Sequence, residues 1–194
     1  MSTQVINPVR NSKALSNGKI GMGFFIGTEM MLFMGFISTF LVIKANALTS
    51  WPPINQPRLP LGVTAINTII LLISGVTCFL AVRSAQAEKN KSFKYLVVSL
   101  FLGLIFLGVQ GWEWIQLLRH GLTLTSSLYG GTFYTLIGLH AFHVLLALIA
   151  LARVTFKSKK GAYLQNANGL EMLFMYWSFV VVIWPVLYGL VYLY

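Results

Sequence analysis

The chain has 194 residues, of which 57% are hydrophobic and only 9% are charged, and its formal net charge is +10. A soluble domain carries roughly a quarter of its residues as Asp, Glu, Lys or Arg, because its surface must be hydrated. A nucleic-acid-binding protein gathers its basic residues on one folded face, whereas the basic residues here stand between long apolar runs. The composition therefore excludes both classes and predicts an integral membrane protein that binds no nucleic acid.

Five apolar runs are each long enough to cross a bilayer, whose hydrocarbon core requires about 20 helical residues. These runs predict helices, because every lipid-exposed amide must be hydrogen-bonded within its own segment and the alternation of a barrel strand is absent. We expect an all-α, polytopic bundle of five transmembrane helices, with a basic tail over 1–19 and one membrane domain over 20–194. In chain order the predicted helices are Ile20–Ile43, Leu61–Val82, Tyr95–Leu118, Tyr129–Ala152 and Leu170–Tyr194.

The basic residues are distributed unequally between the two sides of the predicted membrane. The amino-terminal tail and the second and fourth loops share one side, and cytoplasmic loops are enriched in Lys and Arg. We therefore expect the amino terminus inside and the carboxyl terminus outside. The predicted outer side carries Lys44, Arg58 and Arg119, and the inner side carries Arg10, Lys13, Lys19, Arg83, Lys89, Lys91, Lys94, Arg153, Lys157, Lys159 and Lys160.

Glu29 is the acidic residue that lies deepest in the predicted membrane. It stands nine residues into the first predicted helix, which is about 13 Å from the inner end at 1.5 Å per residue. An ionised carboxylate at that depth is costly, and desolvation favours the neutral form. Two interpretations stay open: a carboxyl that exchanges protons or faces lipid, and a protonated carboxyl that is hydrogen-bonded to a neighbouring helix.

Other acidic residues lie close to helix ends. Glu113 is five residues from the outer end of the third predicted helix, with Gln110 one turn before it. We interpret this pair as a hydrogen-bonding contact between helices, with snorkelling of Glu113 toward the outer interface as the alternative. Glu171 opens the fifth predicted helix, where a carboxylate complements the positive end of the helix dipole. All three residues are interpreted as structural.

His140 and His143 are three positions apart and so share one face of the fourth predicted helix. A metal site usually needs three or four ligands, and the chain supplies no Asp and only one Cys, Cys78. We therefore expect no metal and no redox centre in this chain. We interpret both His residues as structural polar partners of Ser, Thr or Glu side chains on adjacent helices.

Neither the loops nor the small residues predict a catalytic site. The loops between the predicted helices have at most 17 residues, and they contain no nucleophile with a base and no Gly-rich phosphate loop. We therefore assign no catalytic residue. Gly23 and Gly27, like Gly108 and Gly111, are interpreted as positions where helices of the bundle approach closely.

Several different short motifs occur along the chain, from the first predicted helix to the last. They are Phe-Ile-Gly-Thr-Glu at 25–29, Trp51-Pro52-Pro53, Asn67-Thr68, Gln110 with Glu113, Tyr129-Gly130-Gly131-Thr132-Phe133 ahead of His140 and His143, and Glu171 followed by Tyr176-Trp177. In this order and at this spacing, the motifs resemble subunit III of the haem-copper oxidases, most closely that of cytochrome c oxidase.

The resemblance implies a non-catalytic subunit of an oxygen-reducing, proton-translocating oxidase in aerobic respiratory electron transport. Such a subunit carries no haem or copper; those are expected in partner subunits, and it packs on the catalytic subunit I. It binds phospholipid, protects the catalytic subunit during turnover and supports proton uptake. By this resemblance Glu29 and Arg153 are lipid or interhelix contacts. Other oxidase subunits, or a respiratory supercomplex, are further expected partners.

The longest members of that family have seven helices, and the five predicted here match the form of several bacterial members, which indicates a bacterial inner membrane. The chain departs from the family pattern Tyr-Trp-His-Phe-x-Asp at Ser178 and Val181, which leaves a role in proton uptake open. The equivalent subunit of a quinol oxidase, or an accessory protein of a nitric oxide reductase, is an alternative. A small transporter is a rival from another class, but the inverted repeats typical of transporters are not apparent.

Overall fold

The computed structural model describes residues 17–47, 51, 53, 59–85, 88–159 and 167–193. These residues form helices of a length and hydropathy that can span a membrane, so the predicted all-α, five-helix class is confirmed. The predicted basic tail lies outside the described residues as far as residue 16. The elements are α1 (Asn17–Ala45), α2 (Leu61–Ser84), α3 (Lys89–Arg119), α4 (Leu128–Lys159), α5 (Ala167–Tyr188) and the π-helix η2 (Gly189–Leu193).

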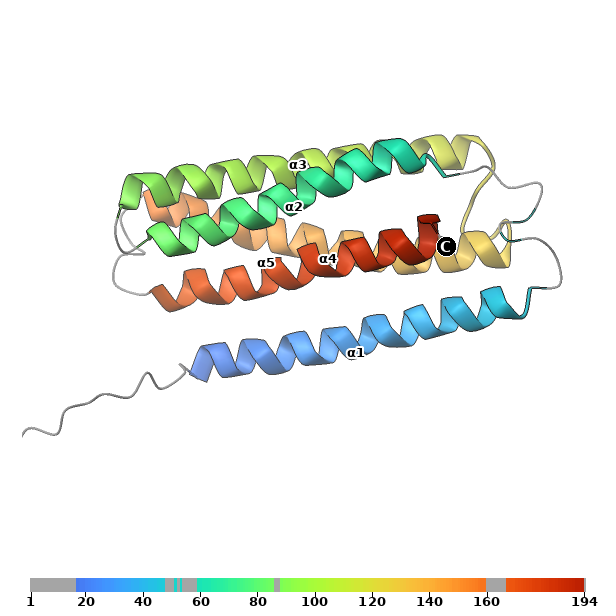
Figure 1. Cartoon of the computed structure of the whole chain (residues 1–194), viewed down its shortest axis with the longest axis horizontal. Coiled ribbons are helices and arrows are strands. Elements are labelled where there is room, and N and C mark those ends of the chain that lie inside the picture. The colour runs from blue at the N-terminus through green and yellow to red at the C-terminus, as the bar shows by residue number, and fades with distance from the viewer. Residues whose placement is uncertain are drawn as a thin grey trace, which may run out of the picture.

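Successive helices run in opposite directions, so all the ends predicted to be inside lie at the same end of the bundle (Figure 1). α2 packs most extensively against α3, and α5 contacts α1, α2 and α4. α1 contacts α5 and, less extensively, α4, and it forms one edge of the bundle (Figure 1). α1 is therefore the helix with the most surface left for lipid or another protein.

The helices extend further at the predicted inner end than hydropathy indicates. α3 begins at Lys89 rather than Tyr95, and α4 continues to Lys159 rather than Ala152. The added turns contain Lys, Asn and Ser. An apolar run marks only the part of a helix inside hydrocarbon, whereas Lys is a good helix former in water. These two helices therefore extend beyond the apolar layer.

The outer end of α5 is shaped by Pro185, which lies inside the helix. Proline has no N–H for the backbone hydrogen bond one turn back. One turn later, at Gly189, the backbone changes to the π-helix η2, a form that is usually short. η2 keeps Val191 and Tyr192 buried, and this places the Tyr192 hydroxyl inside the bundle.

Aromatic rings fill the centre of the bundle. Trp184 is fully buried, and its ring lies 5.0 Å from that of Phe106 on α3 and 4.9 Å from that of His140 on α4, measured between ring centroids. Gly103 gives α3 the room to approach this layer, because a Cβ atom there would lie 2.6 Å from Leu148 Cδ2 and 2.9 Å from the Trp177 ring. The core therefore depends on a residue without a side chain at 103.

Candidate functional site

The deepest polar contact joins α1 to α4. Oε2 of Glu29 lies 2.8 Å from Nε2 of His143, and the side chains are only 17% and 6% exposed, respectively. The other ring nitrogen of His143, Nδ1, lies 2.7 Å from the backbone oxygen of Leu139. We call these two side chains the Glu29–His143 pair.

Hydrogen-bond geometry determines how many protons the Glu29–His143 pair holds. A carbonyl oxygen can only accept, so Nδ1 of His143 carries a hydrogen and donates it to Leu139. The contact between Nε2 and Oε2 then needs one further proton, which stands either on the imidazole or on the carboxyl. The first arrangement is an ion pair and the second is a neutral pair. Both have zero net charge, which is the condition a buried site favours.

A second polar contact ties α1 to the bundle at its predicted inner end. Lys19 forms an ion pair with Glu171 at the start of α5, and their side chains are 23% and 34% exposed. Ion pairs with this much exposure stabilise a fold only weakly. Phe33 contributes more, because it is fully buried and its ring lies 5.2 Å from that of His143. α1 is thus held by a few contacts spaced along its length.

A buried group toward the predicted outer end, here called the outer polar cluster, consists of Thr64, Gln110, Glu113 and Tyr192. Glu113 Oε1 and Oε2 lie 3.0 and 3.2 Å from the Thr64 hydroxyl oxygen. The side-chain amide of Gln110 donates to Glu113 at 3.1 Å and to the Tyr192 hydroxyl at 3.2 Å. The cluster joins α2, α3 and η2 through buried side chains.

The Thr64 hydroxyl has one hydrogen but two neighbouring acceptors. Its oxygen is 3.0 Å from the backbone oxygen of Pro60 as well as 3.0 Å from Glu113 Oε1. If Glu113 carries a proton, it donates to Thr64, and Thr64 donates to Pro60. With Glu113 ionised, the Thr64 hydroxyl would instead donate to the carboxylate, and the Pro60 oxygen would keep only the Thr64 backbone N–H, at 3.2 Å.

His140 lies between these two groups, and its imidazole is fully buried. The ring stacks on Trp184 with an interplanar angle of 27°. Neither ring nitrogen has a hydrogen-bond partner among the described residues. The Ser, Thr or Glu partner that we expected is thus present for His143 but is not found for His140 within the described part of the chain.

Arg153 lies on an exposed face of α4 near the predicted inner end of the bundle. Other exposed basic side chains lie at the same end, namely Lys157 on the same helix, Arg83 on α2, and Lys91 and Lys94 on α3. No group of three His, Cys, Asp or Glu side chains able to hold a metal occurs among the described residues. The polar side chains described above form hydrogen bonds and ion pairs between helices.

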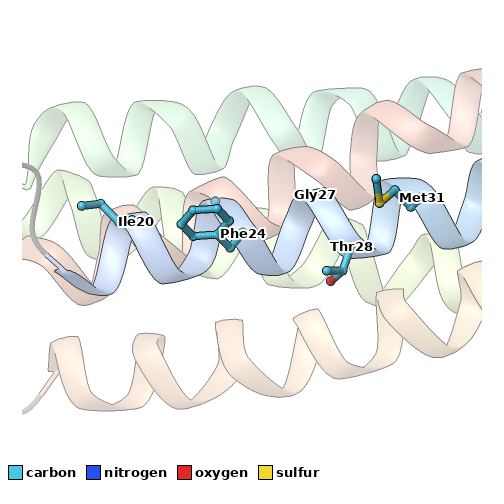
Figure 2. Close-up of a pocket in the computed structure, with 6 residues that line it drawn as sticks. Ile20, Phe24, Gly27, Thr28 and Met31 are labelled. Atoms are coloured by element: carbon cyan, nitrogen blue, oxygen red, sulfur yellow. The ribbon is translucent and has the colours of Figure 1, made fainter.

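The small residues of α1 do not lie at a contact within the bundle, so our interpretation of them is wrong. A Cβ atom at Gly23 or Gly27 would meet nothing within 4 Å, and the same holds for Gly108 and Gly111 on α3. Gly23 and Gly27 instead line a shallow apolar depression on α1 itself (Figure 2), together with Ile20, Phe24, Thr28 and Met31. Spacing alone cannot distinguish an inner face from an outer one in a membrane, because both are apolar.

Thr64 and Tyr192 take part in the outer polar cluster, although no sequence motif predicted such a role for them. Depth in the membrane could have indicated the contact of Thr64 with Glu113. Thr64 lies one turn from the outer end of α2, and Glu113 lies within two turns of the outer end of α3. Tyr192 is drawn inward by the π-helix, and no sequence pattern considered above predicts that change.

Comparisons with known proteins extend over the whole bundle. The family described as cytochrome c oxidase subunit III matches residues 8–194 of the chain. The chain is 31% identical to a protein of Mycobacterium leprae described as a probable cytochrome c oxidase subunit 3, over 99% of this chain and 95% of the relative. It is 30% identical to cytochrome c oxidase subunit 3 of a Bacillus species, over 96% and 90% of the two chains. For the subunit 3 of a Synechocystis species, the identity is 31% over 89% and 74%.

Proposed function

Because the chain belongs to the cytochrome c oxidase subunit III family, we propose that it supports the assembly, lipid retention and proton uptake of the catalytic subunit of an oxygen-reducing, proton-translocating oxidase. Family membership makes it a non-catalytic, integral membrane subunit of cytochrome c oxidase in the respiratory chain. The observation that carries this proposal is the match from residue 8 to residue 194.

The proposed partners follow from what this chain's side chains can coordinate. Both ring nitrogens of His143 are hydrogen-bonded, to Glu29 and to Leu139. Among the described residues, His140 does not belong to any group of three side chains that could hold a metal ion. We therefore assign haem and copper to partner subunits, and we propose that the bundle packs against the catalytic subunit I. Association with further oxidase subunits or a respiratory supercomplex is part of the same proposal.

Lipid binding is proposed at the end of the bundle that we expect to face the inside of a bacterial inner membrane. Arg153 and Lys157 are exposed on α4, and Arg83, Lys91 and Lys94 are exposed nearby in the fold. Basic groups next to the hydrocarbon layer attract anionic headgroups. Arg153 is accordingly a proposed phospholipid contact.

The intramembrane polar residues have proposed structural roles. Glu29 is an interhelix contact through His143. The other polar residues maintain the bundle rather than react; they are Gln110, Glu113, His140 and Glu171. On α5, Val181 packs against α2 at Gly75, where a Cβ atom would lie 3.0 Å from Val181 Cγ1. An apolar side chain that packs between helices thus stands where the family pattern has an ionisable Asp. We therefore propose that this chain contributes little to proton uptake through α5.

Purification of a tagged chain in mild detergent tests the proposed function. We expect haem-containing chains to co-purify and the eluate to show a haem spectrum, with oxygen consumption driven by reduced cytochrome c. A tagged chain carrying the paired changes Gly103→Leu and Gly75→Leu, which block helix packing, serves as the control for nonspecific capture. Elution of the folded wild-type chain without haem-containing partners would contradict the proposal.

A further inference from the structure

Five side chains have buried polar atoms that no described residue satisfies, and three of these side chains lie around Phe106, near the outer polar cluster. In these three, the atoms are Oδ1 of Asn67, Oε1 of Gln110 and both ring nitrogens of His140. The residues are 0%, 2% and 0% exposed, respectively. Buried polar atoms are almost always hydrogen-bonded, to protein or to ordered water. The three residues therefore need a partner that the helices themselves do not provide.

The three side chains surround Phe106 on α3. The side-chain amide of Asn67 donates to the Phe106 backbone oxygen at 3.1 Å. The Phe106 ring lies 6.3 Å from the His140 ring, centroid to centroid. Gln110 follows Phe106 by four residues and so lies on the same face of α3. Elements α2, α3 and α4 thus each bring one unsatisfied side chain to the same part of the interior.

Reorienting these side chains does not remove the need for a partner. Turning over the Asn67 amide would place its oxygen against the Phe106 carbonyl oxygen, so the present donor is required there. Turning over the His140 ring exchanges each nitrogen with a ring carbon, in a ring whose described neighbours are the aromatic rings of Phe33, Phe106 and Trp184. The neutral imidazole offers one donor and one acceptor, and the two amide oxygens offer acceptors only.

We propose that His140 binds internal water together with Asn67 and Gln110. Water can accept from the N–H of His140 and donate to the three acceptors, namely the second ring nitrogen and the two amide oxygens. Because one water molecule has two hydrogens, the set takes at least two water molecules. Apolar cavities stay dry, whereas internal water is stable where two to four polar partners converge. A metal ion fits poorly, because the set contains no charged ligand.

The water site extends the outer polar cluster toward the middle of the membrane. Gln110 already donates to Glu113 and Tyr192, and its oxygen, through water, connects them to His140. A hydrogen-bonded series then runs from Glu113 to the aromatic layer at Trp184. This inference rests on burial and geometry alone and does not depend on the proposed function.

Water-edited solid-state NMR of the full chain, purified in lipid with the chains that accompany it, tests the site directly. Leu139–His140 is the only Leu–His step in this chain, so ¹³C′-Leu with ¹³C,¹⁵N-labelled His selects His140 within it, and the signals lost in His140→Phe distinguish it from the accompanying chains. We expect magnetisation from water to reach the ring nitrogens of His140 well before its backbone nitrogen, which lies inside α4. Ring nitrogens that gain no more than the backbone nitrogen would overturn the proposal.

A pair of variants on α2 separates the water site from general loosening of the bundle. Asn67→Leu removes one partner of the water, and we expect the transfer to the His140 ring to fall about twofold, because internal water is held by only about three hydrogen bonds. Ser74→Ala is the matched control, since the Ser74 hydroxyl is bonded to Ser99 and not to this site. Equal transfer to His140 in wild type and Asn67→Leu would overturn the assignment of Asn67, and an equal loss in both variants would overturn the site.

Discussion

Among single residues, the hydrogen-bond partners of the two buried acids determine where their protons can lie. Glu29 and Glu113 both lie in the apolar layer, but Glu29 has an imidazole beside it and Glu113 has a hydroxyl and an amide. Imidazole can take the proton of its neighbour, whereas a hydroxyl or an amide cannot. The two carboxyls therefore lead to different predictions.

Glu113 is predicted to be protonated near neutral pH, because its carboxyl is buried and its described partners, Thr64 and Gln110, carry no charge. Infrared spectra of the purified complex should contain a carboxylic C=O band that disappears in Glu113→Gln. In Thr64→Val the same band should shift to higher frequency, because the carboxyl loses its acceptor. Glu171→Gln is the control, since Glu171 pairs with Lys19 as a carboxylate. Loss of a carboxylate band in Glu113→Gln would show the prediction to be wrong.

The Glu29–His143 pair is predicted to stabilise the complex as a unit. His143→Leu leaves the Glu29 carboxyl without its partner and should lower the free energy of unfolding by about 1 kcal/mol, the lower end of the range for a stranded buried group, because Glu29 is partly exposed. Glu29→Gln should cost less, since its amide N–H can still donate to His143 Nε2. The double variant Glu29→Leu with His143→Leu should be more stable than the sum of the single changes implies. Thermal unfolding of the complex measures all three, and strict additivity would refute the coupling.

At the scale of elements, hydropathy located the helices well but not their ends or their partners. The apolar runs predicted all five helices because the bilayer imposes their length, yet no apolar run marks the turns of α3 before Tyr95. Glu29, Gln110 and Glu113 stood out because polar residues are rare in such runs. The sequence could not predict which of His140 and His143 contacts Glu29. Residues three positions apart share a helix face, and only the packing of α1 determines which of the two lies beside Glu29.

Packing of α3 into the aromatic layer is predicted to fail when Gly103 gains a side chain. Gly103→Ala would place its Cβ 2.9 Å from the fully buried Trp177 ring, and such overpacking costs about 1–3 kcal/mol. Gly108→Ala is the matched control on the same helix, because its Cβ would meet nothing within 4 Å. The midpoint of thermal unfolding should fall in the first variant and stay or rise slightly in the second. Similar midpoints for both would contradict this account of the core.

At the scale of the whole molecule, the bundle has an asymmetry of charge rather than of hydropathy. Exposed basic side chains gather at the end where α2 ends and α3 begins, whereas the described residues at the opposite end include only Lys44 and Arg119 as basic residues. Figure 1 shows that alternating helix directions bring the ends of α2 and α4 and the starts of α3 and α5 to one end. The same arrangement supports the proposed orientation and the proposed lipid contact, so a test of one bears on the other.

Anionic phospholipid is predicted to be retained through Arg153 and Lys157. One basic residue near a membrane surface contributes about 1 kcal/mol, which is about fivefold in affinity. The double variant Arg153→Gln with Lys157→Gln should therefore retain several-fold less anionic phospholipid after purification, as measured by mass spectrometry of the extracted lipid. The loss should be larger at low ionic strength, where charges are least screened. Zwitterionic lipid, held by the apolar surface, should change little.

The matched control is Arg119→Gln, which removes an exposed charge at the opposite end of the bundle. If basic residues act through their position at the inner end, this control keeps the wild-type amount of anionic lipid. If net charge alone sets retention, the control loses lipid in proportion to its single charge, and the assignment to Arg153 and Lys157 fails. Resupplying anionic lipid to the double variant separates a binding defect from misassembly, because a correctly assembled variant regains turnover stability only at higher lipid concentration.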